Sequence, residues 1–157
     1  MIDQARFAAL LEPRRPFRAI LVGWPAASIP ALLLAVLVAS LFPRVAGPEF
    51  PAVGPETLLL LVVFAPFVET LIMAAALEIL LLALPPRWVV IVSAVGWGLA
   101  HSWAAPAWGL VIWWPFLIFS TLYVTWRGQG RALAISIVFA VHALNNLGPA
   151  LLLLRSA

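Results

Sequence analysis

The stretch LLLLVVFAPFVETLIMAAAL, residues 58–77, decides how this chain folds. It is about as long as the 20 apolar residues with which an α-helix crosses the hydrocarbon core of a bilayer. One charged residue, Glu69, interrupts it, and the stretch contains no Lys or Arg to pair with that carboxylate. A charge at the centre of a membrane helix costs roughly 2.5–3.5 kcal/mol on insertion scales. The sequence therefore predicts a transmembrane helix whose carboxylate is compensated by polar groups elsewhere in the chain.

The composition of the whole chain agrees with a membrane protein. Of its 157 residues 65% are hydrophobic and 10% are charged, and the mean hydropathy is +1.12. A soluble domain carries about 25% charged residues. The net charge of +3 comes from nine arginines placed mostly between apolar segments. That placement indicates a lipid bilayer, and no nucleic acid, as the partner of the charge. The absence of Cys excludes disulfides and thiolate chemistry.

Hydropathy predicts an all-α, polytopic bundle of about five transmembrane helices. Residues 1–18 are expected to form a cytoplasmic, interfacial N-terminal segment, with an amphipathic surface helix over residues 1–12. The remaining residues, 19–157, are expected to form a single membrane domain. Its predicted spans are residues 19–42, 57–84, 88–106, 109–126 and 132–154.

The arginines predict the orientation of these spans. If the N-terminus is cytoplasmic, seven arginines lie inside and only Arg44 and Arg155 lie outside. This asymmetry follows the positive-inside rule and predicts an integral protein of a prokaryotic plasma (inner) membrane. Tryptophans near the span ends are typical of interfacial belts. Those expected at the outer interface are Trp103, Trp108, Trp113 and Trp114, and those at the inner interface are Trp88 and Trp126.

Strongly polar side chains at membrane depth come from three predicted spans. They are Glu69, His101, His142, Asn145 and Asn146. Glu69 and His142 each lie about 12 residues below the outer end of their span, or about 18 Å at 1.5 Å per residue. Intramembrane His and Asn often serve only as hydrogen bonds between helices. A carboxylate, two imidazoles and a carboxamide that converge from separate helices predict a functional site instead.

Glu78 has a different interpretation, although it lies in the same predicted span as Glu69. It follows Glu69 by nine residues, which is half a turn out of phase on a helix of 3.6 residues per turn. It also lies close to the inner end of the span. We therefore expect it to form an interfacial ion pair with Arg87 or Arg131.

The deep polar residues suit hydrolysis. A carboxylate near an imidazole can activate water, and a His and an Asn on one helix face can donate to an oxyanion. Glu69, His101 and His142 are equally suited to bind a divalent metal such as zinc, although no H-E-x-x-H motif is present. A haem between His101 and His142 and a proton pathway through Glu69 are further alternatives.

Three short motifs resemble those of the CPBP (Abi) intramembrane endopeptidases, which include the CAAX prenyl endopeptidases. The family motifs are E-E-x-x-x-R, F-x-x-x-H and H-x-x-x-N, on three successive membrane helices. Here they correspond to ETLIMA at Glu69–Ala74, WGLAH at Trp97–His101 and HALNN at His142–Asn146. The resemblance covers residues 57–154 and implies an intramembrane protease fold.

The resemblance also implies roles for single residues. Glu69 and His101 match the pair thought to activate water, and His142 and Asn146 match the oxyanion pocket. No cofactor is expected under this mechanism, and a zinc ion held by Glu69, His101 and His142 is the alternative. The first motif is degenerate, since Thr70 replaces its second Glu and Ala74 replaces its Arg. Losing both together strands no buried charge.

The expected function is an intramembrane endopeptidase. Its partner would be a membrane-anchored or lipid-modified protein or peptide, cleaved near the anchor. The alternative is a non-catalytic scaffold of the same family that acts as an immunity or binding protein, which the degenerate first motif favours.

Overall fold

The computed structural model describes residues 15–45, 47 and 54–155. The amphipathic helix expected over residues 1–12 lies outside this part of the chain. All regular structure in the described part is helical. In chain order it consists of α2 (Pro16–Leu41), α3 (Pro55–Leu59), the π-helical turn η1 (Leu60–Phe64), α4 (Ala65–Leu80), α5 (Pro86–Ala104), α6 (Gly109–Trp126), the 3₁₀ turn η2 (Arg127–Gln129) and α7 (Arg131–Arg155).

Four of these helices are long and apolar enough to cross a membrane, which makes the chain an integral membrane protein. They run over Pro16–Leu41, Glu56–Leu80, Gly109–Gln129 and Arg131–Arg155. The segment expected as a span over residues 88–106 forms α5, a helix of 19 residues, but is not among the four. Its two serines, two glycines and one histidine lower its hydropathy. The all-α bundle predicted from sequence is confirmed.

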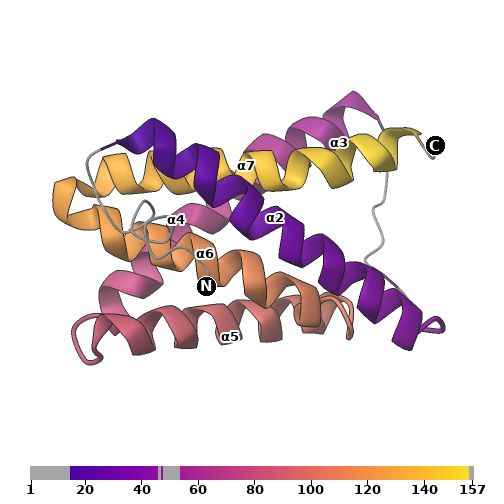
Figure 1. Cartoon of the computed structure of the whole chain (residues 1–157), viewed down its shortest axis with the longest axis horizontal. Coiled ribbons are helices and arrows are strands. Elements are labelled where there is room, and N and C mark those ends of the chain that lie inside the picture. The colour runs from indigo at the N-terminus through magenta and orange to yellow at the C-terminus, as the bar shows by residue number, and fades with distance from the viewer. Residues whose placement is uncertain (1–14, 46, 48–53, 156–157) are drawn as a thin grey trace, which may run out of the picture.

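Helix α6 lies at the centre of the bundle, and α2, α5 and α7 all pack against it. Figure 1 shows α2 crossing diagonally over α6 and α7, with α5 along the opposite side of α6. About 56% of the apolar stretch of α6 is buried, against 17–28% in the other three spans. The outer helices therefore present most of their apolar surface to lipid.

Small residues let the helices approach closely. The buried residues of α2 recur every fourth position and are all small: Ala19, Gly23, Ala27 and Ala31. A Cβ on Gly23 would lie 3.0 Å from Cδ1 of Leu122 on α6. Where α5 and α6 meet, a Cβ on Gly109 would collide with the backbone oxygen of Gly98. Such contacts are how membrane helices associate without a hydrophobic driving force.

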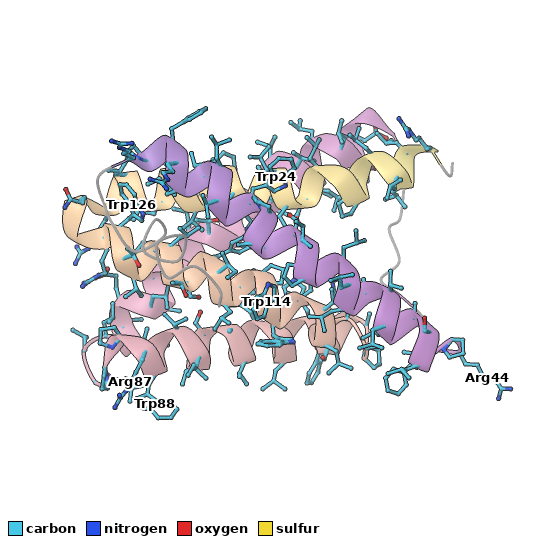
Figure 2. All side chains as sticks on the ribbon, in the orientation of Figure 1. Trp24, Arg44, Arg87, Trp88, Trp114 and Trp126 are labelled. Atoms are coloured by element: carbon cyan, nitrogen blue, oxygen red, sulfur yellow. The ribbon has the colours of Figure 1, made fainter. Side chains whose placement is uncertain are left out.

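The helix ends that carry most of the arginines lie at one end of the bundle (Figure 1). Arg15 precedes α2 and Arg131 begins α7. Arg127 follows α6, and Arg87 lies in the first turn of α5, shortly after α4 ends. In Figure 2, Arg87 and Trp88 lie at one end of the molecule and Arg44 at the other. Trp103 is 95% exposed, as an interfacial tryptophan would be. Trp126, expected at the inner interface, is the last residue of α6 and precedes Arg127, but its side chain is 1% exposed because α6 is enclosed by the other helices.

Candidate functional site

The structure brings Glu69 of α4 and His142 of α7 together. Oε2 of Glu69 lies 3.5 Å from Nε2 of His142. The glutamate side chain is 28% exposed and the histidine side chain 4%. At this distance the two groups interact electrostatically, although the separation exceeds that of a good hydrogen bond. The buried histidine therefore faces a carboxylate that is itself reachable from outside the bundle.

Aromatic rings enclose the rest of His142. Its ring centroid lies 4.5 Å from that of Phe119 and 5.5 Å from that of Phe116, both on α6. Its second nitrogen, Nδ1, is buried and has no hydrogen-bond partner in the described part of the chain. Buried polar atoms in proteins nearly always form hydrogen bonds, and leaving such an atom without a partner costs about 1–3 kcal/mol. His142 thus offers one nitrogen to Glu69 and keeps one unsatisfied.

His101 on α5 is connected to this pair through an aromatic ring of α6. Its Nδ1 lies 2.9 Å from the backbone oxygen of Trp97, one turn earlier on the same helix. A carbonyl only accepts hydrogen bonds, so Nδ1 carries the proton in neutral His101 and Nε2 is a free acceptor. The His101 ring contacts Phe116 at 5.7 Å, and Phe116 also contacts His142 at 5.5 Å. One phenyl ring thus connects the two imidazoles.

Asn146 lies one turn beyond His142, where it donates a hydrogen bond to a backbone carbonyl. Its Nδ2 lies 3.1 Å from the oxygen of Leu61, in the π-helical turn η1. That oxygen lacks a backbone donor because the amide of Ala65 bonds Leu60, five residues back, and the next residue, Pro66, has no N–H. A proline in a membrane helix is tolerated when a neighbouring group satisfies the carbonyl that it frees.

A carbonyl freed by a proline is bonded by a neighbouring side chain in α2 as well. Pro30 removes the donor that would bond the oxygen of Ala26, and Nε1 of Trp114 on α6 donates to that oxygen at 2.9 Å. Side chains of α6 and α7 therefore compensate prolines in two neighbouring helices. Asn146 consequently has a structural role in addition to any role in chemistry.

Two residues outside the predicted site complete a hydrogen-bonded chain. Ser28 of α2 donates to Oδ1 of Asn145 at 3.0 Å, and Nδ2 of Asn145 donates to Oδ1 of Asn146 at 3.2 Å. The chain continues from Asn146 to Leu61 and links α2, α7 and η1. The adjacent asparagines at membrane depth are visible in the sequence. Nothing in the sequence pairs them with Ser28, 117 residues away.

The positions that depart from the resembled motif lie on the buried face of α4. Thr70 is fully buried and Ala74 is 4% exposed. Within the described residues, the hydroxyl oxygen of Thr70 has no hydrogen-bond partner. A Glu at position 70 would be enclosed in the bundle, whereas Ala74 also lines an open pocket beside Glu78. The joint replacement of Glu and Arg by a small polar and a small apolar residue leaves no unpaired charge at these positions.

The zinc alternative was predicted to use Glu69, His101 and His142. Within residues 15–45, 47 and 54–155, no three His, Cys, Asp or Glu side chains are grouped closely enough to hold one. Glu69 and His142 are paired, whereas the contacts of His101 are with Trp97 and Phe116.

Glu78 forms the ion pair expected of it, with one partner confirmed and one different. Arg131 Nη2 lies 2.9 Å from Oε2, as predicted. The second partner is Arg127 and not Arg87: its Nε and Nη2 donate to the two carboxylate oxygens at 2.8 and 2.9 Å. The hydroxyl of Tyr123 adds a bond of 3.0 Å. Arg127 pairs with Glu78 because α6 ends beside α4, so that the Nε–Nη2 edge of the guanidinium group faces the carboxylate.

Comparisons with known proteins give no match, so the geometry described above is the basis for any proposed function. The chain matches no protein-family model, no curated protein and no solved structure.

Proposed function

We propose that the protein is an intramembrane endopeptidase in which Glu69 activates water. The observation that carries the proposal is the Glu69–His142 pair, a carboxylate and an imidazole 3.5 Å apart on two membrane helices. Intramembrane ionisable residues are rare and expensive, and they mark functional sites by default. The partial exposure of Glu69 gives a water molecule and a substrate a way to reach it.

The proposed reaction uses the chain's own groups. Glu69 takes a proton from water as the water oxygen attacks the scissile carbonyl carbon. Nε2–H of His142 and the second amide hydrogen of Asn146 are the candidate donors to the oxyanion that forms. Glu69 then returns the proton to the leaving nitrogen as the C–N bond breaks. The free Nε2 of His101 accepts a hydrogen bond that orients the water.

The proposed substrate is a membrane-anchored or lipid-modified protein or peptide, cut near its anchor. Support for this class comes from the location of the pair within apolar helices and from the resemblance of the three motifs to the CPBP endopeptidases. We place the protein in a prokaryotic plasma membrane with its N-terminus in the cytoplasm. That orientation rests on the excess of arginines at one end of the bundle.

The test is proteolysis in membranes. Wild type and variants are co-expressed with tagged reporters that carry a single C-terminal span or a prenylated tail, and products are read on a blot. Glu69→Gln and His101→Ala should remove the shortened product while membrane levels of the protein hold. Glu56→Gln makes the same chemical change at an exposed carboxylate of the same span and should leave cleavage intact. Cleavage that survives Glu69→Gln would rule out the mechanism.

A second function is favoured by Thr70 and Ala74. A binding or immunity protein that keeps the scaffold without catalysis would need neither the second Glu nor the Arg of the first motif. Its activity, read as protection of cells or capture of a partner, would then be unchanged by Glu69→Gln.

A further inference from the structure

A second polar cluster lies at the arginine-rich end of the bundle. The carboxylate of Glu78 on α4 receives bonds from Arg127, Arg131 and the hydroxyl of Tyr123, all between 2.8 and 3.0 Å. Two guanidinium groups face one carboxylate, so the cluster carries a net charge of +1. It joins the ends of α4, α6 and α7 and lies about 13.5 Å along α4 from Glu69, at 1.5 Å per residue.

Arg127 makes two hydrogen bonds to Glu78, and Arg131 makes one. Arg127 binds the carboxylate through Nε and Nη2, and its side chain is 35% exposed. Arg131 binds it through Nη2 alone, and its side chain is 69% exposed. Nε and Nη1 of Arg131 therefore remain available as donors. The uncompensated positive charge of the cluster lies at the exposed arginine.

An apolar pocket opens beside this charge, between α4, α6 and α7. Its volume is about 310 Å³, and Glu78, Tyr123 and Arg131 form its polar end. The apolar wall consists of Leu71, Ala74, Ala75 and Ile135. Leu71 and Glu78 are two helical turns apart, so the wall extends about 10 Å along α4. One turn further on each helix, Phe67 and Phe139 meet edge to face with centroids 5.9 Å apart.

We propose that this pocket binds an anionic phospholipid of the surrounding bilayer. The phosphate would contact the free nitrogens of Arg131, and the upper part of one acyl chain would lie along Leu71, Ala75 and Ile135. Basic pockets between membrane helices bind lipid headgroups in this way. The Phe67–Phe139 pair, one helical turn beyond the wall, would bound the part of the chain that the pocket holds.

The shape of the pocket favours a lipid over a free anion. A soluble phosphate would need only the arginine and would leave the apolar wall unused. Leu71 is 40% exposed on a helix that is apolar enough to span the membrane, so the wall faces hydrocarbon. A phospholipid matches both ends of the pocket, because its headgroup is charged and its chains are apolar. This binding site is independent of the proposed peptidase chemistry at Glu69.

The test is lipid retention by the full-length protein, purified in detergent and titrated with phosphatidylglycerol or phosphatidylcholine. Native mass spectrometry counts the lipid-bound species. We expect wild type to retain more phosphatidylglycerol, and Arg131→Gln to weaken that retention about fivefold, equivalent to about 1 kcal/mol for one arginine at a membrane surface. Ala75→Leu keeps every charge but fills the wall, and should also weaken retention.

Arg87→Gln is the matched control, because it removes one exposed arginine at the same end of the molecule (Figure 2) but outside the pocket. It should leave retention unchanged. Equal retention of the two lipids by wild type would overturn the proposal, as would equal losses in Arg87→Gln and Arg131→Gln. Displacement of the lipid by millimolar inorganic phosphate, together with no effect of Ala75→Leu, would identify a simple anion site and also overturn it.

Discussion

Two carboxylates on helix α4, Glu69 and Glu78, are nine residues apart and have opposite surroundings. Glu78 accepts four hydrogen bonds of 2.8–3.0 Å from two arginines and a tyrosine. Among the residues that the structure describes, Glu69 has one partner, the imidazole of His142, at 3.5 Å. The first carboxylate is fully compensated, as in a structural ion pair. The second is held in the membrane with little compensation, which is the arrangement expected of a group that acts on something else.

The largest expected effect is on cleavage. Glu69→Gln should lower the rate of proteolysis by roughly 10²–10⁴-fold, the usual contribution of a general base. Glu78→Gln should lower it only in proportion to any loss of folded protein. Initial rates on one reporter, normalised to the amount of protein in the membrane, check this. Equal rates for the two variants would contradict the proposal that Glu69, and not Glu78, acts in catalysis.

The next effect is on stability and has the opposite pattern. Glu78→Gln should lower the free energy of unfolding by about 1–3 kcal/mol, because it leaves Arg127 and Arg131 without a counter-charge. That range lies below the cost for a fully buried pair because both arginines are partly exposed. Glu69→Gln should leave stability unchanged or raise it. Unfolding in mixed detergent micelles measures both, and a larger loss at Glu69 would contradict the assignment.

A smaller effect tests the structural role of Asn146. Asn146→Ala should cost about 0.6–1.7 kcal/mol, the range for hydrogen bonds between membrane helices. In a Pro66→Ala background the backbone regains a donor for the oxygen of Leu61, so the cost of Asn146→Ala should shrink. A double-mutant cycle on unfolding free energies measures this coupling. Strictly additive losses would show that the amide does not compensate the proline.

The smallest effect is expected at Ser28. Ser28→Ala removes the first bond of the chain that reaches Leu61 through Asn145 and Asn146. The loss of stability should be about 0.6 kcal/mol, the average for such bonds in a membrane protein. Ser40→Ala is a suitable control, because Ser40 is exposed and bonds only its own helix. A loss at Ser28 no greater than at Ser40 would mean that the chain adds no stability.

Much of the fold was predictable because spanning a bilayer constrains a sequence strongly. The predicted span at residues 109–126 coincides with α6, and that at residues 132–154 differs from α7 by one residue at each end. The span predicted at residues 57–84 is helical only as far as Leu80, and it holds a π-helical turn just before Pro66, which hydropathy does not register. Trp126 lies at the predicted end of its span, but its side chain is buried, because a residue near a span end faces lipid only if its helix does.

The residues of the site were predictable from the sequence, but not all of their contacts were. Glu69 and His142 were expected to converge from their depths, and they do. The proximity of His101 to Glu69 stays a prediction, and the contacts described for His101 are with the carbonyl oxygen of Trp97 and the ring of Phe116. Depth follows from counting residues, whereas contact depends on how each helix is rotated about its axis. The assigned catalytic roles stay predictions for the experiments above.

The sequence by itself determined that the chain is an all-α membrane protein and which polar side chains lie deep in its helices, because burial in hydrocarbon selects long apolar runs. Only the tertiary structure decided the partners. Glu69 faces His142, Glu78 takes Arg127 with Arg131, and Asn146 serves the carbonyl freed by Pro66. Partners depend on how each helix is rotated and how closely it packs, as at Gly23 and Gly109, where neighbouring helices approach closely, and hydropathy does not specify either property.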